Sequence, residues 1–133
     1  MPSDVILVVD GNNVMGAAAD GWWRDRRGAV RRLHRRLVAY RAATGDEVVL
    51  ALDVPQPDLP AGDNDGVEVA YPARRGRDAA DDRIAEEVTR DRDPASLVVI
   101  TSDRGLAERV RASGASVEGA GTLLTRLDAL EPG

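Results

Sequence analysis

Four short runs of apolar residues alternate with longer stretches in which apolar positions recur every three or four residues. The runs cover residues 5–9, 48–52, 67–71 and 97–101 and are rich in Val, Ile and Leu. Continuous apolar runs of this length are typical of strands buried on both faces of a sheet. We therefore predict four buried strands, and a short fifth strand near Ser116.

The stretches between the runs have helical periodicity. In residues 28–44 (GAVRRLHRRLVAYRAAT), Val30, Leu33 and Leu37 fall on one face, and the following GDE provides a stop signal. Residues 78–91 form a second predicted helix with Asp78 as its N-cap.

Two further helices are predicted over residues 103–114, with Gly114 as C-cap, and over residues 121–130. Strands that alternate with helices predict a mainly parallel central sheet with helices on both faces. The exception is the Pro-, Gly- and Asp-rich segment 53–66, which we expect to be a long surface loop. The predicted fold class is α/β, in a single domain that spans all 133 residues.

Three of the predicted strands are followed by an aspartate, namely Asp10, Asp53 and Asp103. Parallel strands end at the same edge of a sheet, and the carboxyl edge is where ligands bind in open α/β folds. A single aspartate at such a position is explained equally well as a helix N-cap or a turn former. Three at equivalent positions favour a common site.

A fourth candidate lies on the second predicted helix. Asp81 precedes Ile84 and Val88 by three and seven residues, so we expect it on their inward face. Its neighbour Asp82 is turned by roughly 100° toward solvent. The alternative for Asp81 is a first-turn carboxylate that the helix dipole favours.

Carboxylates that converge repel one another unless they are protonated or bridged by a cation. With one histidine and no cysteine in the chain, oxygen ligands favour Mg2+ or Mn2+ over zinc. Such ions support phosphoryl chemistry without a protein nucleophile. The absence of cysteine also excludes disulfides and cysteine catalysis.

Polar residues beside these aspartates are candidates for supporting roles. Asn13 is expected to position a carboxylate or a phosphate, with Asn12 next to it, while Thr101 and Ser102 are expected to orient carboxylates or water by hydrogen bonds. The alternatives are turn formation for the two asparagines and helix capping for Ser102.

The charge distribution points to a polyanionic partner. The net charge is -5, but residues 21–44 hold eight arginines and one acid, which leaves -12 for the rest of the chain. A basic helix often serves only solubility; a second cluster, ARRGR at 73–77, makes phosphate binding the stronger interpretation. The candidates for contact with this polyanion are Arg24, Arg27, Arg31, Arg35, Arg74, Arg75 and Arg77.

Aromatic residues and the histidine add less. One of Trp22 and Trp23 is expected to pack the preceding loop, and the other to stack on a base. We expect His34 to be a packed or surface histidine rather than a catalytic base. The amino-terminal apolar run is too short for a signal peptide or a membrane span, so we expect a cytoplasmic protein with no membrane partner.

Four motifs occur in order between about residues 5 and 114: VVDGNNVMG, ALD, DAADDRI and VITSDRGLAERV. In these motifs the sequence resembles the NYN family of PIN-like nucleases, in particular its bacterial YacP-like branch. The pair of acids in ADD departs from the family pattern, which needs one acid, so the choice of Asp81 rests on helical register. A toxin-type PIN nuclease fits Gly11 and Asn13 less well, and a haloacid dehalogenase would have aspartate in place of Asn12.

The resemblance implies a Rossmann-like PIN/NYN domain, dependence on Mg2+ or Mn2+ and endoribonuclease activity. It implies a site of Asp10, Asn13, Asp81 and Asp103, with Asp53 as a further metal candidate. The implied substrate is single-stranded or messenger RNA, including ribosome-associated RNA. Two alternatives stay open: a non-catalytic RNA-binding protein with this fold, and a nucleotide phosphohydrolase, although the chain has no P-loop motif.

Overall fold

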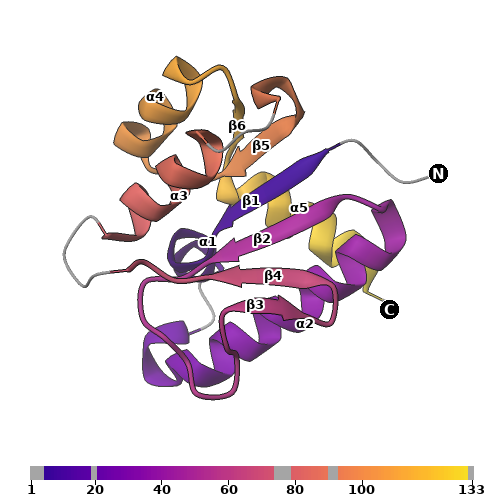
Figure 1. Ribbon diagram of the computed structural model, residues 1–133. Coiled ribbons are helices and arrows are strands. Elements are labelled where there is room, and N and C mark those ends of the chain that lie inside the picture. Colours follow the sequence, from indigo (N-terminus) through magenta and orange to yellow (C-terminus); the bar gives the residue numbers. More distant parts are fainter. Residues whose placement is uncertain (1–4, 19–20, 74–78, 90–92, 132–133) are drawn as a thin grey trace.

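A six-stranded sheet in the order β3-β4-β2-β1-β5-β6 forms the centre of the molecule. The computed structural model describes residues 5–18, 21–73, 79–89 and 93–131 (Figure 1). All strands are parallel except β3, which pairs antiparallel with β4. The strands are β1 (Ile6–Asp10), β2 (Glu47–Ala51), β3 (Gly62–Asn64), β4 (Val67–Ala70), β5 (Leu97–Ile100) and β6 (Ser116–Glu118).

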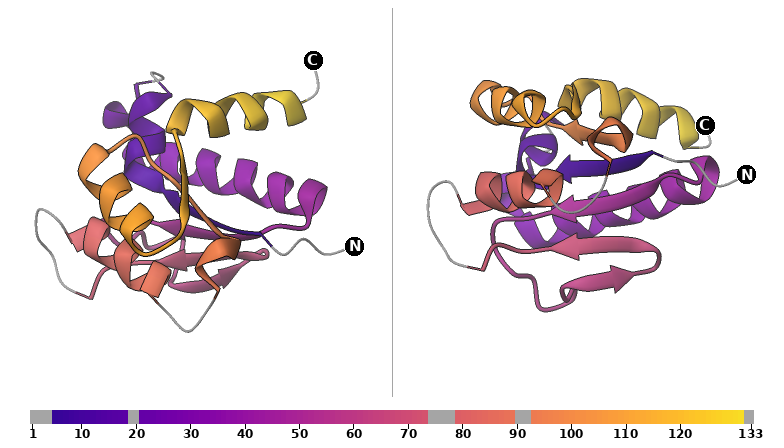
Figure 2. Two further views of the ribbon diagram at one scale, coloured as in Figure 1. Left: turned by 90° about the horizontal axis from the view of Figure 1, so that it is seen from above. Right: turned by 45° about the horizontal axis from the view of Figure 1, so that its top comes forward.

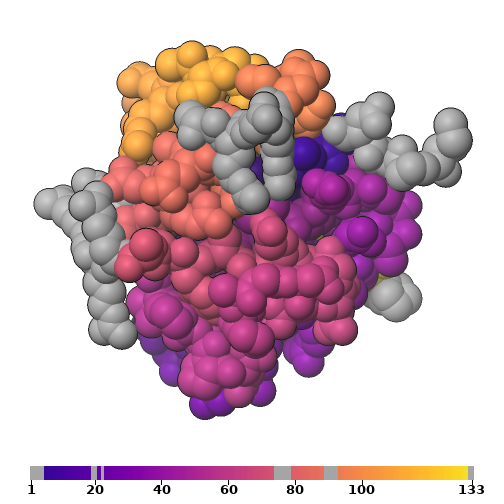
Figure 3. All heavy atoms as spheres, in the orientation of Figure 1, coloured from indigo at the N-terminus to yellow at the C-terminus, as the bar shows by residue number. Residues whose placement is uncertain are grey.

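Helices cover both faces of this sheet, as predicted (Figure 2). They are α1 (Gly11–Ala17), α2 (Arg26–Thr44), α3 (Ala79–Thr89), α4 (Arg104–Ala112) and α5 (Ala120–Leu130), with short 3-10 turns η1 (Trp22–Arg24) and η2 (Pro94–Ser96). Side chains alternate along β1, so that Leu7 and Val9 pack with α1, α2 and α5, whereas Val8 packs with α3 and α4. Figure 3 shows the face on which α3 and α4 lie next to each other. The α/β fold with a mainly parallel sheet is therefore confirmed.

The predicted helix stops are confirmed at two glycines. Helix α2 ends at Thr44 and is followed by Gly45 at φ 78°, and Gly114 takes φ 92° just after α4. Both angles lie in the left-handed region, where glycine is favoured because it has no Cβ. Asp78, the predicted N-cap of α3, lies outside the described residues.

Helix α1 was not predicted, because the GNN sequence was interpreted as a turn. The structure has no turn here: β1 ends at Asp10, and seven helical residues begin at Gly11. This entry is possible because Gly11 packs against β2: a Cβ at this position would lie 2.7 Å from Leu52 Cδ2 and 2.9 Å from the Ala51 carbonyl oxygen. The absence of a side chain thus lets the start of α1 approach the next strand closely.

The segment 53–66 is not a simple surface loop. It contains β3, and Asp65 and Gly66 both take positive φ at the turn into β4, as in tight hairpins. The Tyr71 hydroxyl donates to the Leu59 carbonyl oxygen at 2.6 Å, which anchors the segment to the sheet. No described helix is both long and apolar enough to cross a bilayer.

Candidate functional site

Asp10 lies at the carboxyl end of β1 and is the most buried of the candidate acids, with 6% of its surface exposed. Since side chains alternate along a strand, it points to the same face as Val8, toward α3 and α4. The Thr101 hydroxyl donates to Asp10 Oδ2 at 2.8 Å, and its oxygen accepts from the Asp103 backbone N–H at 3.1 Å. Thr101 therefore joins the ends of β1 and β5 through its side chain.

The electrostatic environment of Asp10 is unfavourable for a negative charge. Burial raises the pKa of this carboxyl to about 6, and the hydrogen bond from Thr101 opposes the rise. The negative charges of Asp81 and Asp103 raise the pKa further. The three carboxylates thus share one electrostatic environment, although they come from three separate segments of the chain.

Asp103 also has a structural role, which the sequence allowed as the alternative. Its Oδ1 accepts from the Leu106 backbone N–H at 2.9 Å and caps the start of α4. Only one of its oxygens takes part in this bond. The capping bond fixes the carboxylate beside the ends of β1 and β5.

Asn13 and Ser102 connect the same two strand ends from the other side. Asn13 Oδ1 accepts from the Ser102 backbone N–H at 2.7 Å. The Ser102 hydroxyl oxygen accepts from the Ala120 N–H at 3.0 Å, at the beginning of α5. Ser102 therefore does serve a helix start, but that of α5 rather than of the helix that follows it in sequence. Asn13 lies within α1 and not in a turn.

The two acids of the ADD motif have different neighbours. The negative charge of Asp81 raises the pKa of Asp10, which agrees with the predicted position of Asp81 on the inward face of its helix. Asp82, which we predicted to turn toward solvent, keeps 33% of its side chain exposed, and its Oδ1 accepts from Arg109 Nη1 of α4 at 3.1 Å. Packing of α3 against α4 brings this arginine to Asp82. Asp82 thus belongs to a contact between the two helices.

Asp53 follows β2 as predicted, but it is paired with an arginine. Arg26 donates to Asp53, and the same Nη2 donates to Asn12 Oδ1 at 3.1 Å. These contacts attach the start of α2 to the carboxyl edge of the sheet. The sequence assigned Arg26 only to a basic run, because its partners lie 14 and 27 residues away.

The basic surface of α2 is smaller than its sequence suggests. Arg27 binds both oxygens of Asp58, at 2.8 and 2.7 Å, and Arg31 lies 3.8 Å from the same carboxylate.

A second pairing lies further along α2, where Arg36 is paired with Asp128 and Glu131 at the end of α5. Arg36 is therefore half-buried. Acids distant in sequence therefore offset part of the charge of this helix, while Arg35 remains exposed.

Trp23 is exposed over 63% of its surface, and the Arg24 guanidinium lies 5.7 Å from the centre of its ring. Such an exposed ring is compatible with the base-stacking role expected for one of the two tryptophans. The Trp22 side chain and Arg74, Arg75 and Arg77 lie outside the described residues.

His34 is buried, and its Nε2 lies 2.9 Å from the Asn64 carbonyl oxygen of β3. It is therefore a packed histidine, as predicted.

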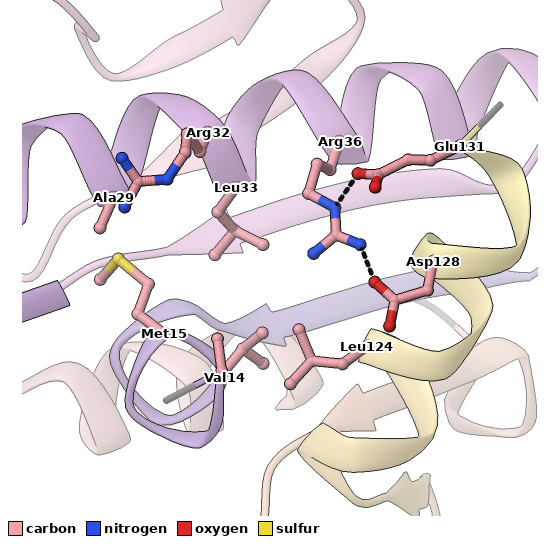
Figure 4. Close-up of a pocket in the computed structure, with 10 residues that line it drawn as sticks. Val14, Met15, Ala29, Arg32, Leu33, Arg36, Leu124, Asp128 and Glu131 are labelled. Atoms are coloured by element: carbon pink, nitrogen blue, oxygen red, sulfur yellow. Dashed lines mark hydrogen bonds and ion pairs between the residues drawn. The ribbon is translucent and has the colours of Figure 1, made fainter. Parts of the chain in front are cut away.

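A hollow of about 220 Å³ lies between α1, α2 and α5 (Figure 4). Its floor is apolar, with Val14, Leu33 and Leu124, and its rim carries Arg36 bound to acids of α5. It is built on the opposite face of the sheet from the one to which Asp10 points. The hollow contains none of the candidate acids and is separate from the carboxyl edge.

The acidic side chains at the carboxyl edge are of a kind that binds divalent cations, but they are spaced too widely to enclose one. A buried Asp10 with a raised pKa beside two further acids offers hard oxygen ligands that a cation would neutralise. Among the residues that the structure describes, no three histidine or acidic side chains form a ready cage for a metal ion. Binding an ion between these carboxylates therefore requires their side chains to move closer together.

The mainly parallel sheet with helices on both faces fits the class of PIN-like nuclease folds. The sequence matches the family model of the YacP-like NYN domain over residues 7–132, and the chain belongs to that family.

The chain resembles two crystal structures of Rae1 (YacP) from Bacillus subtilis, each with a TM-score of 0.74 and 26% sequence identity. One structure is of the protein itself, and the other is of a tryptophan-to-leucine mutant. The similarity covers 95% of this chain and 76% of the mutant protein, and 94% and 74% for the other structure. A comparison with curated proteins gives no significant match.

Proposed function

We propose that the protein is a divalent-metal-dependent endoribonuclease. The observation that carries the proposal is the convergence of Asp10, Asp81 and Asp103, each from a different element, so that the charges of two acids act on the buried third. Membership of a family of PIN-like nucleases supports hydrolysis of a phosphodiester bond. The substrate class, RNA, is carried over from the family.

In this proposal the three aspartates hold Mg2+ or Mn2+ at the carboxyl edge. The bound ion supplies charge neutralisation for the phosphate and activation of water. Thr101 orients Asp10 through its hydroxyl and prevents rotation of the carboxylate. Asn13 is held by the Ser102 N–H through its oxygen, so its amide hydrogens are available to a phosphate oxygen or a water.

Two residues expected at the site have other contacts. Asp53 would have to release Arg26, and Asp82 would have to release Arg109, before either could bind a metal. We therefore assign neither of them as a ligand. Asn12 has a positioning role through Arg26.

The test is cleavage of a pool of single-stranded and structured RNA in Mg2+, Mn2+ or EDTA. We expect cleavage by the wild type in metal only, and loss of cleavage in Asp10→Asn and Asp103→Asn. Asparagine keeps the size of both side chains and remains a good N-cap at position 103. Asp82→Asn is the matched control and retains activity.

Wild-type cleavage rates in both Asp10→Asn and Asp103→Asn would refute the assigned site. RNA binding without cleavage under any metal condition would instead favour the non-catalytic RNA-binding alternative. Cleavage of nucleotides but not of RNA would favour a phosphohydrolase.

A further inference from the structure

A second hollow adjoins the carboxyl edge, between the end of β5, helix α4 and the turn from β6 into α5. Its volume is about 420 Å³. Its lining includes Ser102, Asp103, Arg104, Glu108, Arg111 and Gly119. The hollow thus begins at one of the proposed metal ligands and extends along α4.

The arginines of this hollow differ from those of α2. In the part of the chain that the structure describes, neither Arg104 nor Arg111 makes a side-chain hydrogen bond or ion pair, and both are exposed. The two are seven residues apart, which is almost two helical turns, so they share one side of α4 about 10 Å apart along its axis. Arg27 and Arg36 of α2, in contrast, already bind acids.

We propose that this hollow binds the sugar-phosphate backbone of the RNA strand next to the bond that is cut, with Arg104 and Arg111 on its phosphates. The inference rests on the proposed function, since Asp103 marks the position of the reacting phosphate. Guanidinium groups bind phosphate oxygens through paired, charge-assisted hydrogen bonds. The Ser102 hydroxyl accepts from Ala120 and keeps its own hydrogen for a backbone oxygen of the RNA.

Glu108 lines the same hollow and carries the opposite charge. It lies one turn after Arg104 on α4 and makes no ion pair with that arginine among the described contacts. A carboxylate there opposes the approach of a phosphate. Substitutions of opposite sign within one hollow are therefore expected to change RNA affinity in opposite directions.

Binding of a fluorescent single-stranded RNA, followed by anisotropy in EDTA, tests the proposal without cleavage. The double variant R104A/R111A is expected to weaken binding at least about tenfold. It should also lower the slope of log affinity against log salt by roughly 1.4, or about 0.7 for each phosphate that an arginine no longer neutralises. E108Q is expected to tighten binding about twofold or more.

The control is R41A, because Arg41 is exposed near the end of α2, at the opposite edge of the sheet. It removes one positive charge, as each of the single variants R104A and R111A does, and is compared with them. We expect R41A to bind like the wild type. In cleavage assays the double variant should raise KM and leave kcat within about twofold, as expected for a group that binds substrate and transition state equally.

Unchanged affinity and salt slope in R104A/R111A would overturn the proposal. A loss of affinity in R41A equal to that in R104A or R111A alone would overturn it too, because the effect would then be one of net charge alone. If the wild type cuts RNA and the double variant behaves like it, the proposed function stands and only this subsite fails. A wild type that neither binds nor cuts RNA would overturn both.

Discussion

At the scale of single residues, Asp10 is a buried side chain whose negative charge is unfavourable in the folded protein. Its pKa is about 6 when folded, against 3.8 for a free aspartate, so the folded state holds the proton more tightly. Ionisation of Asp10 therefore lowers the free energy of unfolding as pH rises from about 4 through 6. With roughly 1.4 kcal/mol for each pKa unit, the loss reaches at most about 3 kcal/mol above pH 7.

Asp10→Asn is predicted to be more stable than the wild type at pH 7.5 in EDTA, by about 1 to 3 kcal/mol, because the amide does not ionise. This advantage should shrink as pH falls below 6. Urea unfolding of both proteins at pH 7.5 and pH 5 measures the difference. A constant difference between the two pH values would show that Asp10 ionises normally.

Thr101 offers a second test at this scale. Thr101→Val keeps the shape but removes the hydroxyl that donates to Asp10 and accepts from the Asp103 N–H. We predict a fall in kcat of about 10- to 100-fold, as is typical for groups that orient metal ligands. Thr101→Ser keeps both hydrogen bonds and should retain most activity; equal activity in the valine and serine variants would remove Thr101 from the mechanism.

At the scale of elements, the entry from β1 into α1 depends on one glycine. Gly11→Ala places a methyl group within 3 Å of the β2 backbone and of Leu52. We predict a loss of about 1 to 3 kcal/mol in the free energy of unfolding.

Gly121→Ala is the matched control. This helical glycine of α5 has open space around its Cβ position, so its replacement should be neutral or slightly stabilising. Chemical denaturation compares the two variants. Equal stabilities would mean that the close approach at Gly11 is not required.

The elements that the sequence predicted correctly are those with a long periodic pattern. Helix α2 and the four long strands were recognised because their apolar residues face the core at regular spacing. Helix α1 was missed because seven residues are too few to show a period, and strand β3 because its sequence, GDN, contains no apolar residue. The turn residues Asp65 and Gly66 were the available signal for the hairpin.

The candidate site was predictable to a similar degree. Asp10 and Asp103 follow buried strands, and the parallel sheet brings such strand ends to one edge. The pairing of Asp82 with Arg109 and of Asp53 with Arg26 depends on how helices pack against the sheet and each other. Local sequence carries no signal for contacts of this kind.

At the scale of the whole molecule, the site lies where the chain reverses its direction across the sheet. From β1 the chain moves outward through β2 to β4, and it returns through α3 to β5 on the other side of β1. A crevice forms at the carboxyl edge of such a reversal, and open α/β proteins bind ligands there. Asp10 and Asp103 lie on its two sides, and α3 brings Asp81 to them.

The charge distribution of the molecule is consistent with this location. Acids at the end of α5 and in segment 53–66 offset arginines of α2, whereas Arg104 and Arg111 beside the proposed site make no described ion pair. The basic run that dominates the sequence is thus partly structural. Acidic and unpaired basic groups lie together at the carboxyl edge.

The most direct test of whether the carboxyl edge is a metal site is calorimetric titration with Mn2+. The wild type, Asp81→Asn and Asp82→Asn are titrated side by side. The two variants remove the same charge from adjacent residues of α3, but only Asp81 acts on Asp10. We predict that Asp81→Asn weakens Mn2+ binding about tenfold or more and that Asp82→Asn changes it less than about threefold. Wild-type Mn2+ affinity in Asp81→Asn, or an equal loss in both variants, would contradict the assignment of this site.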